Sequence, residues 1–197
     1  MQIVRKSSFT ANPWKNGGGI THEAIRVPAQ GNPFRWRVSV AQIDSAGPFS
    51  DFAGYDRKMV LLRGGGVRLT FGGGDPVVLR NVGDLVEFDG AVPTDCELLA
   101  GPCTDLNLMV SKTLAGVRVW VQRVDGPYPL NAAHPGVTLV FAIQGSLVLE
   151  GARAGTASLE PWDLALISPA EAVAVRLASE QAPPPLVFFA TLDDNSP

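Results

Sequence analysis

The sequence contains very little histidine and cysteine, with two residues of each type among 197. Cys96 and Cys103 are seven positions apart and have no second pair, whereas a zinc site needs two such pairs or matching histidines. His22 and His134 are isolated too, so the closely spaced histidines of a transition-metal site are missing. We therefore expect reduced structural thiols, no bound metal and no cofactor, and we assign no role to either histidine.

Positive charge and long apolar stretches are scarce as well. Lys and Arg number 16 against 19 Asp and Glu, and no basic run would neutralise a row of phosphates. No apolar stretch approaches the roughly 20 residues that cross a bilayer. The first ten residues contain no apolar signal core. We expect a cytoplasmic protein that binds neither membranes nor, directly, nucleic acid.

Glycine and proline are abundant, with 21 and 16 residues, and both disfavour helix interiors and favour turns. Apolar residues recur at every second position in Phe34–Val40, Val67–Phe71 and Val117–Gln122, which is typical of half-buried strands. This period puts Arg37 and Ser39 on the face opposite Trp36. Short strands separated by turn residues predict an all-β sandwich or barrel, with one short helical turn near Ser45–Tyr55.

The chain also contains a pattern of internal repetition. Met59–Gly64 matches Thr138–Gly145, because each is an apolar strand that ends in a polar residue and a glycine. An Asp-Leu pair follows at a similar distance in both copies, at Asp84 and Asp163. The pattern predicts one compact unit, residues 1–197, made of two jelly-roll-like halves, residues 1–112 and 113–197. The alternative is that a β-rich chain produces such matches by chance.

Three segments carry residue types suited to ligand binding. The glycines Gly17–Gly19 either shape a site or form a bulged entry into a strand. Arg57 begins an apolar strand, where its planar guanidinium could point into a barrel mouth and bind a carboxylate in bidentate fashion. It could equally be exposed or paired with an Asp. In Asp105–Met109, alternation leaves Asp105, Asn107 and Met109 on one face, which is either pocket lining or solvent-exposed.

Five ordered motifs carry a family resemblance. The sequence resembles the HutD/Ves family in Trp14-x-Asn16-Gly17-Gly18-Gly19-x-Thr21-x-Glu23, Trp36-Arg37-x-Ser39-x-Ala41, Gly47-Pro48-Phe49-Ser50, Gly54-x-Asp56-Arg57 and Asp105-x-Asn107-x-Met109. The resemblance implies a bicupin fold, which is two jelly-roll-like β-barrel halves in one chain. The C-terminal half resembles the family in pattern alone.

The resemblance also implies a function. Members of the family are linked to histidine utilisation, so we expect a metal-free cupin that binds a small carboxylate of the urocanate or formylglutamate type and regulates that pathway. Arg57 would anchor the carboxylate, and Arg37 would supply a second cation or be a structural partner for Asp56. Apolar walls, hydrogen bonds and space for the ligand would come from Trp14, Trp36, Asn16, Thr21, Ser39, Asn107 and Gly18. No residue is assigned a catalytic role.

Two other functions stay open. The protein could be an enzyme, an isomerase or a hydrolase, acting on a similar small carboxylate, which turnover of pathway intermediates would reveal. It could instead be a structural or partner-binding module, which an interior packed with side chains would favour. The ligand and the oligomeric state, with a homodimer among the alternatives, are left open.

Overall fold

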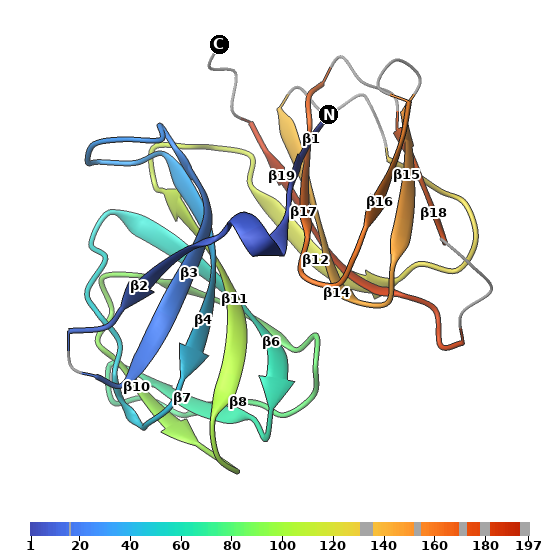
Figure 1. The fold of residues 1–197 in the computed structure, drawn as a ribbon. Helices are drawn as coiled ribbons and strands as arrows, with labels where there is room; N and C mark the ends of the chain where they lie inside the picture. Colours follow the sequence, from blue (N-terminus) through green and yellow to red (C-terminus); the bar gives the residue numbers. More distant parts are fainter. Residues whose placement is uncertain (16, 131–135, 152–154, 170–172, 178–181, 194–197) are drawn as a thin grey trace. The chain divides into compact units, whose positions relative to one another are not determined.

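The computed structural model describes residues 1–15, 17–130, 136–151, 155–169, 173–177 and 182–193 (Figure 1). The chain divides into two compact units, which we call the N-terminal unit, Phe9–Thr113, and the C-terminal unit, Met1–Ser8 with Leu114–Pro197. Among the described residues the single helical segment is the 3-10 turn η1, Lys6–Ser8. The fold is therefore all-β, as the turn-rich sequence predicts.

Two antiparallel sheets form the N-terminal unit. The larger sheet has six strands, in the order β2 (Thr10–Pro13), β3 (Gly19–Val27), β4 (Trp36–Ile43), β11 (Cys103–Ser111), β6 (Tyr55–Gly64) and β9 (Leu85–Asp89). The smaller sheet has four, in the order β5 (Gly47–Pro48), β10 (Thr94–Leu98), β7 (Val67–Phe71) and β8 (Val77–Leu79).

Two antiparallel sheets also form the C-terminal unit. The larger sheet runs in the order β1 (Gln2–Val4), β17 (Leu164–Ile167), β14 (Val137–Gln144), β19 (Leu186–Leu192) and β12 (Arg118–Arg123). The smaller sheet runs in the order β13 (Tyr128–Leu130), β18 (Val173–Leu177), β15 (Leu147–Gly151) and β16 (Gly155–Leu159). Strand β1 pairs with β17, so the first eight residues belong to the C-terminal unit. The sequence pattern instead predicts them in the N-terminal half, residues 1–112.

Each unit has its own apolar core. In the N-terminal unit, Met59, Leu61 and Leu69 are fully buried in a cluster that also holds both cysteines. In the C-terminal unit, Phe189 is fully buried, and the Trp120 and Tyr128 rings lie 5.2 and 5.3 Å from its ring centre. Successive side chains of a strand point to opposite faces of its sheet, so each strand buries every second residue in the core and turns the residues between them to the other face.

The repeated sequence pattern has a counterpart in backbone hydrogen bonds. The Leu61 N–H on β6 donates to Asp84 C=O at 3.0 Å, and the Leu61 C=O accepts from Gly83 N–H at 2.8 Å. On β14, Ala142 makes the equivalent bonds with Asp163 and Trp162, at 3.2 and 2.6 Å. The Asp turns of the two copies therefore close onto equivalent strand positions.

The helical turn predicted near Ser45–Tyr55 is wrong. The segment contains the short strand β5 and irregular turns. Gly54 has a φ of +87°, which a helix does not accommodate, and the Ala53 N–H donates to the Asp51 carboxylate at 2.8 Å. The positive φ of Gly54 and the hydrogen bond to the Asp51 side chain therefore stabilise turns in this segment instead of a helix.

Candidate binding pocket

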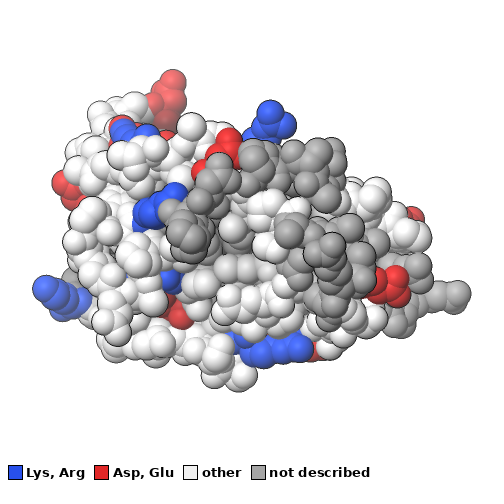
Figure 2. Space-filling view, turned by 90° about the horizontal axis from the view of Figure 1, so that it is seen from above, with Lys and Arg blue, Asp and Glu red and all other residues white. Residues whose placement is uncertain are grey.

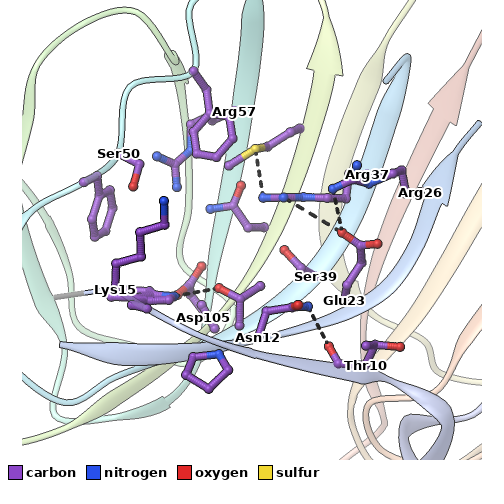
Figure 3. Close-up of a pocket in the computed structure, with 18 of the residues that line it drawn as sticks. Thr10, Asn12, Lys15, Glu23, Arg26, Arg37, Ser39, Ser50, Arg57 and Asp105 are labelled. Carbon is purple, nitrogen blue, oxygen red and sulfur yellow. Dashed lines mark hydrogen bonds and ion pairs between the residues drawn. The ribbon is translucent and has the colours of Figure 1, made fainter. Parts of the chain in front are cut away.

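A pocket of about 790 Å³ lies in the N-terminal unit, on one face of the six-stranded sheet (Figure 3). Its rim is exposed and comes from β2, the loop after it and the segment after β5, whereas its floor is buried and comes from β4, β6 and β11. The lining comprises Thr10, Asn12, Pro13, Trp14, Lys15, Thr21, Glu23, Arg26, Arg37, Ser39, Ala41, Pro48, Phe49, Ser50, Phe52, Arg57, Asp105, Asn107 and Met109.

Strand register brings the floor residues together. Met109 on β11 lies opposite Arg37 on β4 and opposite Arg57 on β6. Two residues along, Asn107 lies opposite Ser39 in the same way. Successive side chains of a strand point to opposite faces, so these residues share a face and line one cavity. Pairing distant strands thus places two cations and a neutral amide within a small area.

Arg57 is held among aromatic rings. Its guanidinium carbon lies 5.0, 5.7 and 5.0 Å from the ring centres of Phe49, Phe52 and Phe88. The residue is 6% exposed, and within the described part of the chain its side chain makes no hydrogen bond and no ion pair. Burial lowers the pKa of Arg57 to about 10, partly offset by the Asp105 charge. Arg57 therefore stays protonated at neutral pH with unused donors in the pocket.

Arg37 occupies a second position with a different environment. Its guanidinium donates to the Met109 sulfur at 3.3 Å and lies 3.9 Å from the Glu23 carboxylate (Figure 3). Glu23 also pairs with Arg26 at 3.3 Å, so one carboxylate serves two cations. Burial lowers the pKa of Arg37, and Glu23 opposes that shift. Arg37 is thus partly neutralised, unlike Arg57.

Asp105 and Asn107 form the acceptor side of the floor. Asp105 is 2% exposed, and burial raises the pKa of its carboxyl to about 7, while the Arg57 charge and a hydrogen bond from the Asn107 side chain oppose the rise. Asn107 is 5% exposed, and its Oδ1 is buried with no partner in the described structure. The floor therefore contains a proton-exchanging carboxyl and an unsatisfied acceptor.

The glycine-rich loop supports the rim. A Cβ at Gly19 would lie 2.2 Å from the Gln42 carbonyl oxygen and 3.1 Å from the Trp14 ring, so this close approach to β4 requires glycine. The Trp14 indole N–H donates to the Thr21 hydroxyl at 2.7 Å. Gly19 thus allows the close packing of the loop on β4, and the hydrogen bond to Thr21 holds the Trp14 ring at the pocket.

Most of the sequence-predicted site residues line this pocket. Six of the nine do so: Trp14, Thr21, Arg37, Ser39, Arg57 and Asn107. The predicted position of Trp36 in the wall is wrong, because alternation along β4 turns it away from Arg37, and it is buried outside the lining. Gly18 is also outside the lining, and its carbonyl accepts from the Asp44 and Ser45 N–H groups. Asn16 and His134 lie outside the described residues.

Several lining residues have no role in the prediction from the sequence. Glu23 and Asp105 stand inside the quoted motifs, and their alternation with Thr21 and Asn107 was the available signal. Lys15 is exposed, and Figure 3 shows its ammonium group extending toward Arg57 and Ser50. Nothing local in the sequence marks Arg26. The pocket residues include four cations and two acids: Lys15, Arg26, Arg37 and Arg57 against Glu23 and Asp105.

Other kinds of site have less support in the described residues. No group of three or more His, Cys, Asp or Glu side chains there is placed to hold a metal ion. No helix in the described chain is long and apolar enough to cross a membrane. On the face in Figure 2, Lys and Arg side chains lie in separate small groups among acidic ones.

Known proteins of one family resemble this chain in sequence. The family model HutD matches residues 6–182. An uncharacterised 21.2 kDa protein in the hutC 3′ region of Pseudomonas putida is 40% identical over 143 residues, covering 72% of this chain and 74% of that protein. Protein Ves of Escherichia fergusonii is 41% identical over 143 residues, 72% of this chain and 71% of that protein.

Solved structures extend the likeness over almost the whole chain. A conserved protein of unknown function from Pseudomonas aeruginosa PAO1 matches with a TM-score of 0.88 at 30% identity, covering 98% of both chains. HutD from Pseudomonas fluorescens SBW25 matches with a TM-score of 0.77 at 27% identity, covering 97% and 98%. An oxalate decarboxylase of Bacillus subtilis, 11% identical with a TM-score of 0.69 over 100% of this chain and 78% of that one, shows a cupin-like fold alone. The chain belongs to the HutD family.

Proposed function

We propose that the pocket binds a small carboxylated metabolite of the urocanate or formylglutamate type, and that Arg57 anchors the carboxylate. The observation that carries this proposal is the buried Arg57 guanidinium, which has no hydrogen bond or ion pair among the described residues. Burying a cation that no hydrogen bond or ion pair holds is unfavourable by on the order of several kcal/mol, and the Asp105 charge offsets this for Arg57 only in part. A bound carboxylate would remove that penalty.

The surroundings of Arg57 favour a planar anion. Phe49 and Phe88 cover the guanidinium at 5.0 Å, which leaves its N–H groups as the binding surface. Arginine donates two parallel hydrogen bonds to a carboxylate in this way. The volume of about 790 Å³ falls within the range of roughly 300–1,000 Å³ typical of small-molecule sites. A metabolite of this class fits with room for water.

In this proposal the site works without a metal ion. Four cationic side chains face two acids in the lining, so the field in the pocket attracts anions and opposes metal cations.

We further propose that the two units are the two barrel halves of a bicupin. The equivalent hydrogen bonds of Leu61 and Ala142 support this relation between the halves.

We propose that the protein regulates histidine utilisation in the cytoplasm. Two relatives support the pathway through their names, one being HutD itself and the other a protein in a hutC 3′ region. Regulation would act through the bound metabolite, with its concentration setting the liganded fraction of the protein.

Asp105 supports a second candidate function, an isomerase or hydrolase acting on a similar carboxylate. A carboxyl whose pKa is raised to about 7 exchanges protons readily at neutral pH, as a general acid or base must. Incubation with urocanate and formylglutamate, followed by product analysis, separates the candidates. Turnover that Asp105→Asn abolishes would favour the enzyme.

Calorimetric titration with urocanate and with N-formyl-L-glutamate tests the main proposal. We expect at least one ligand to bind, and Arg57→Met to weaken it by about a hundredfold, since two charge-assisted hydrogen bonds are lost. Arg63→Met is the matched control, because Arg63 is exposed on the same strand. Absence of binding to the folded wild-type protein, or equal binding by Arg57→Met, would overturn the proposal.

A further inference from the structure

On the pocket floor, Asn107 has a buried acceptor without a partner among the described residues, whereas the unpaired atoms of Arg37 and Arg57 are donors. Asn107 lies on β11, opposite Ser39 on one side and Met59 on the other, and it is 5% exposed. Its side chain lies close to the Asp105 carboxyl and lowers the pKa of that group. Its Oδ1 is buried and has no partner among the described residues. A buried acceptor left in this state is unfavourable by about 1–3 kcal/mol.

The orientation of the Asn107 amide follows from its neighbour. An ionised carboxylate accepts hydrogen bonds and cannot donate, so the Nδ2 group must face Asp105. Rotating the amide would bring its carbonyl oxygen against the carboxylate. Oδ1 is therefore directed away from Asp105 whenever Asp105 is ionised.

We infer that Asn107 determines the selectivity of the pocket, because its Oδ1 accepts a hydrogen bond from an N–H group of the bound carboxylate. The inference rests on the proposed function and narrows the ligand class to carboxylates that also carry an N–H donor. Arg57 precedes Met59 by two residues on the same face of β6, a separation of about 7 Å. We therefore expect the ligand N–H group to lie within about 7 Å of the ligand carboxylate. An amide or imidazole N–H meets this requirement, whereas an ester or oxazole does not.

The discrimination comes from the unpaired acceptor. A ligand without the N–H still places its carboxylate on Arg57, but it leaves the Asn107 Oδ1 buried and unsatisfied. Sites built to hydrogen-bond a ligand reject analogues that lack the matching group more strongly than sites that only measure size. We expect an isosteric analogue without N–H to bind about ten- to a hundredfold more weakly.

Paired ligands on the wild-type protein provide the test. Urocanate is compared with 3-(oxazol-4-yl)acrylate, in which an oxygen replaces the imidazole N–H. N-formyl-L-glutamate is compared with freshly prepared 2-(formyloxy)pentanedioate, in which an oxygen replaces the amide N–H. Titrations at about pH 8.5 keep Asp105 ionised, since its pKa is about 7. The expected result is a ten- to hundredfold preference for the N–H ligand of whichever pair binds.

Asn107→Leu removes the acceptor at similar volume, and we expect it to bring the two members of the pair within about twofold. Asn81→Leu is the matched control, because Asn81 is exposed in the same unit and is not part of the pocket lining, and it should keep the preference. Equal binding of a pair to the wild-type protein would overturn the inference and leave the proposed function standing. Failure of both N–H ligands to bind would overturn both. If Asn107→Leu does not fold, the wild-type ratio decides alone.

Discussion

The two units carry different residues at strand positions that their common hydrogen-bond pattern makes equivalent. Aligning Leu61 with Ala142 aligns Met59 on β6 with Val140 on β14. Asn107 lies opposite Met59 in one unit, and Phe189 lies opposite Val140 in the other. In the N-terminal unit the neighbouring strand β4 places the small hydroxyl of Ser39 opposite Asn107. In the C-terminal unit the neighbouring strand β12 places the indole of Trp120 opposite Phe189.

The difference shows how similar strand pairings produce either a pocket or a core. In the C-terminal unit, the Trp120 and Phe189 rings stack with centres 5.2 Å apart and occupy the interior. In the N-terminal unit, Ser39 and Asn107 leave space at the equivalent positions, and charged residues enclose it. Backbone pairing is common to both units, so the residues at a few inward positions decide whether the interior is filled or open.

Truncating the aromatic core of the C-terminal unit should give the largest effect on stability. Phe189→Ala removes a fully buried ring, and we expect the free energy of unfolding to fall by about 3–5 kcal/mol. Ligand affinity of the folded protein should not change, because Phe189 is not part of the pocket lining. Urea unfolding and calorimetric titration measure the two quantities.

Phe49→Ala is the counterpart in the N-terminal unit. Phe49 is half-buried and covers the Arg57 guanidinium, so its removal should lower affinity more than stability. If Phe189→Ala weakened binding in the folded protein as strongly as Phe49→Ala does, the division of tasks between the units would be incorrect.

Asp105 should make stability depend on pH. Burial raises the pKa of its carboxyl from an unfolded value near 4 to about 7, so the folded protein binds more protons than the unfolded chain between these values. The stability contribution of this group therefore falls as pH rises from about 4 to about 7. The free energy of unfolding of Asp105→Asn, measured relative to that of the wild type, should therefore rise by on the order of 2 kcal/mol from about pH 5 to about pH 8. Denaturant unfolding at the two pH values measures this.

The same carboxyl should couple binding to pH. A ligand carboxylate on Arg57 disfavours the charged form of Asp105, so affinity in the wild-type protein should decrease from about pH 6 to about pH 8. Asp105→Asn should bind with little change over this interval. A pH dependence that survives unchanged in the Asp105→Asn protein would assign the effect to another group.

Lys15 should give the smallest effect, on the rate of association. The side chain is exposed at the rim and extends toward Arg57, so it adds positive potential without a fixed contact (Figure 3). Lys15→Ala should slow association of a carboxylate ligand about two- to fivefold at low salt, with little change at about 1 M salt, where charges are screened. Stopped-flow fluorescence measures the rates. If association with the Lys15→Ala protein were still slower than with the wild type at high salt, Lys15 would contact the ligand directly.

Strand positions were predictable wherever alternation was strict. Val67–Phe71 is a strand with the predicted bounds. The same period predicts that Arg37 and Ser39 share a face, and the structure places both in the lining. Residue type alone predicts Trp36, one position away, in the pocket wall, although the period that places Arg37 there turns Trp36 away.

Residues brought in by other strands were less predictable. Arg26 lies three positions from Glu23 and follows a bulge between Glu23 and Ile25, so a simple period does not give its face. Lys15 reaches the pocket because β2 and β3 form the edge next to β4, an order that depends on long-range pairing. The buried state of Asp105 likewise depends on its position between β4 and β6. These features arise from sheet assembly, which no local pattern encodes.

The side-chain Nε–H resonance of Arg57 reports most directly on the central claim, that this guanidinium anchors a carboxylate. In the unliganded protein the Nε group is buried and has no acceptor among the described residues. Titration with urocanate and N-formyl-L-glutamate should move this NMR signal in a saturable way, while the amide signals of β14 and β19 stay in place. Binding that shifts the signals of β14 and β19 and leaves the Arg57 resonance unchanged would contradict the account.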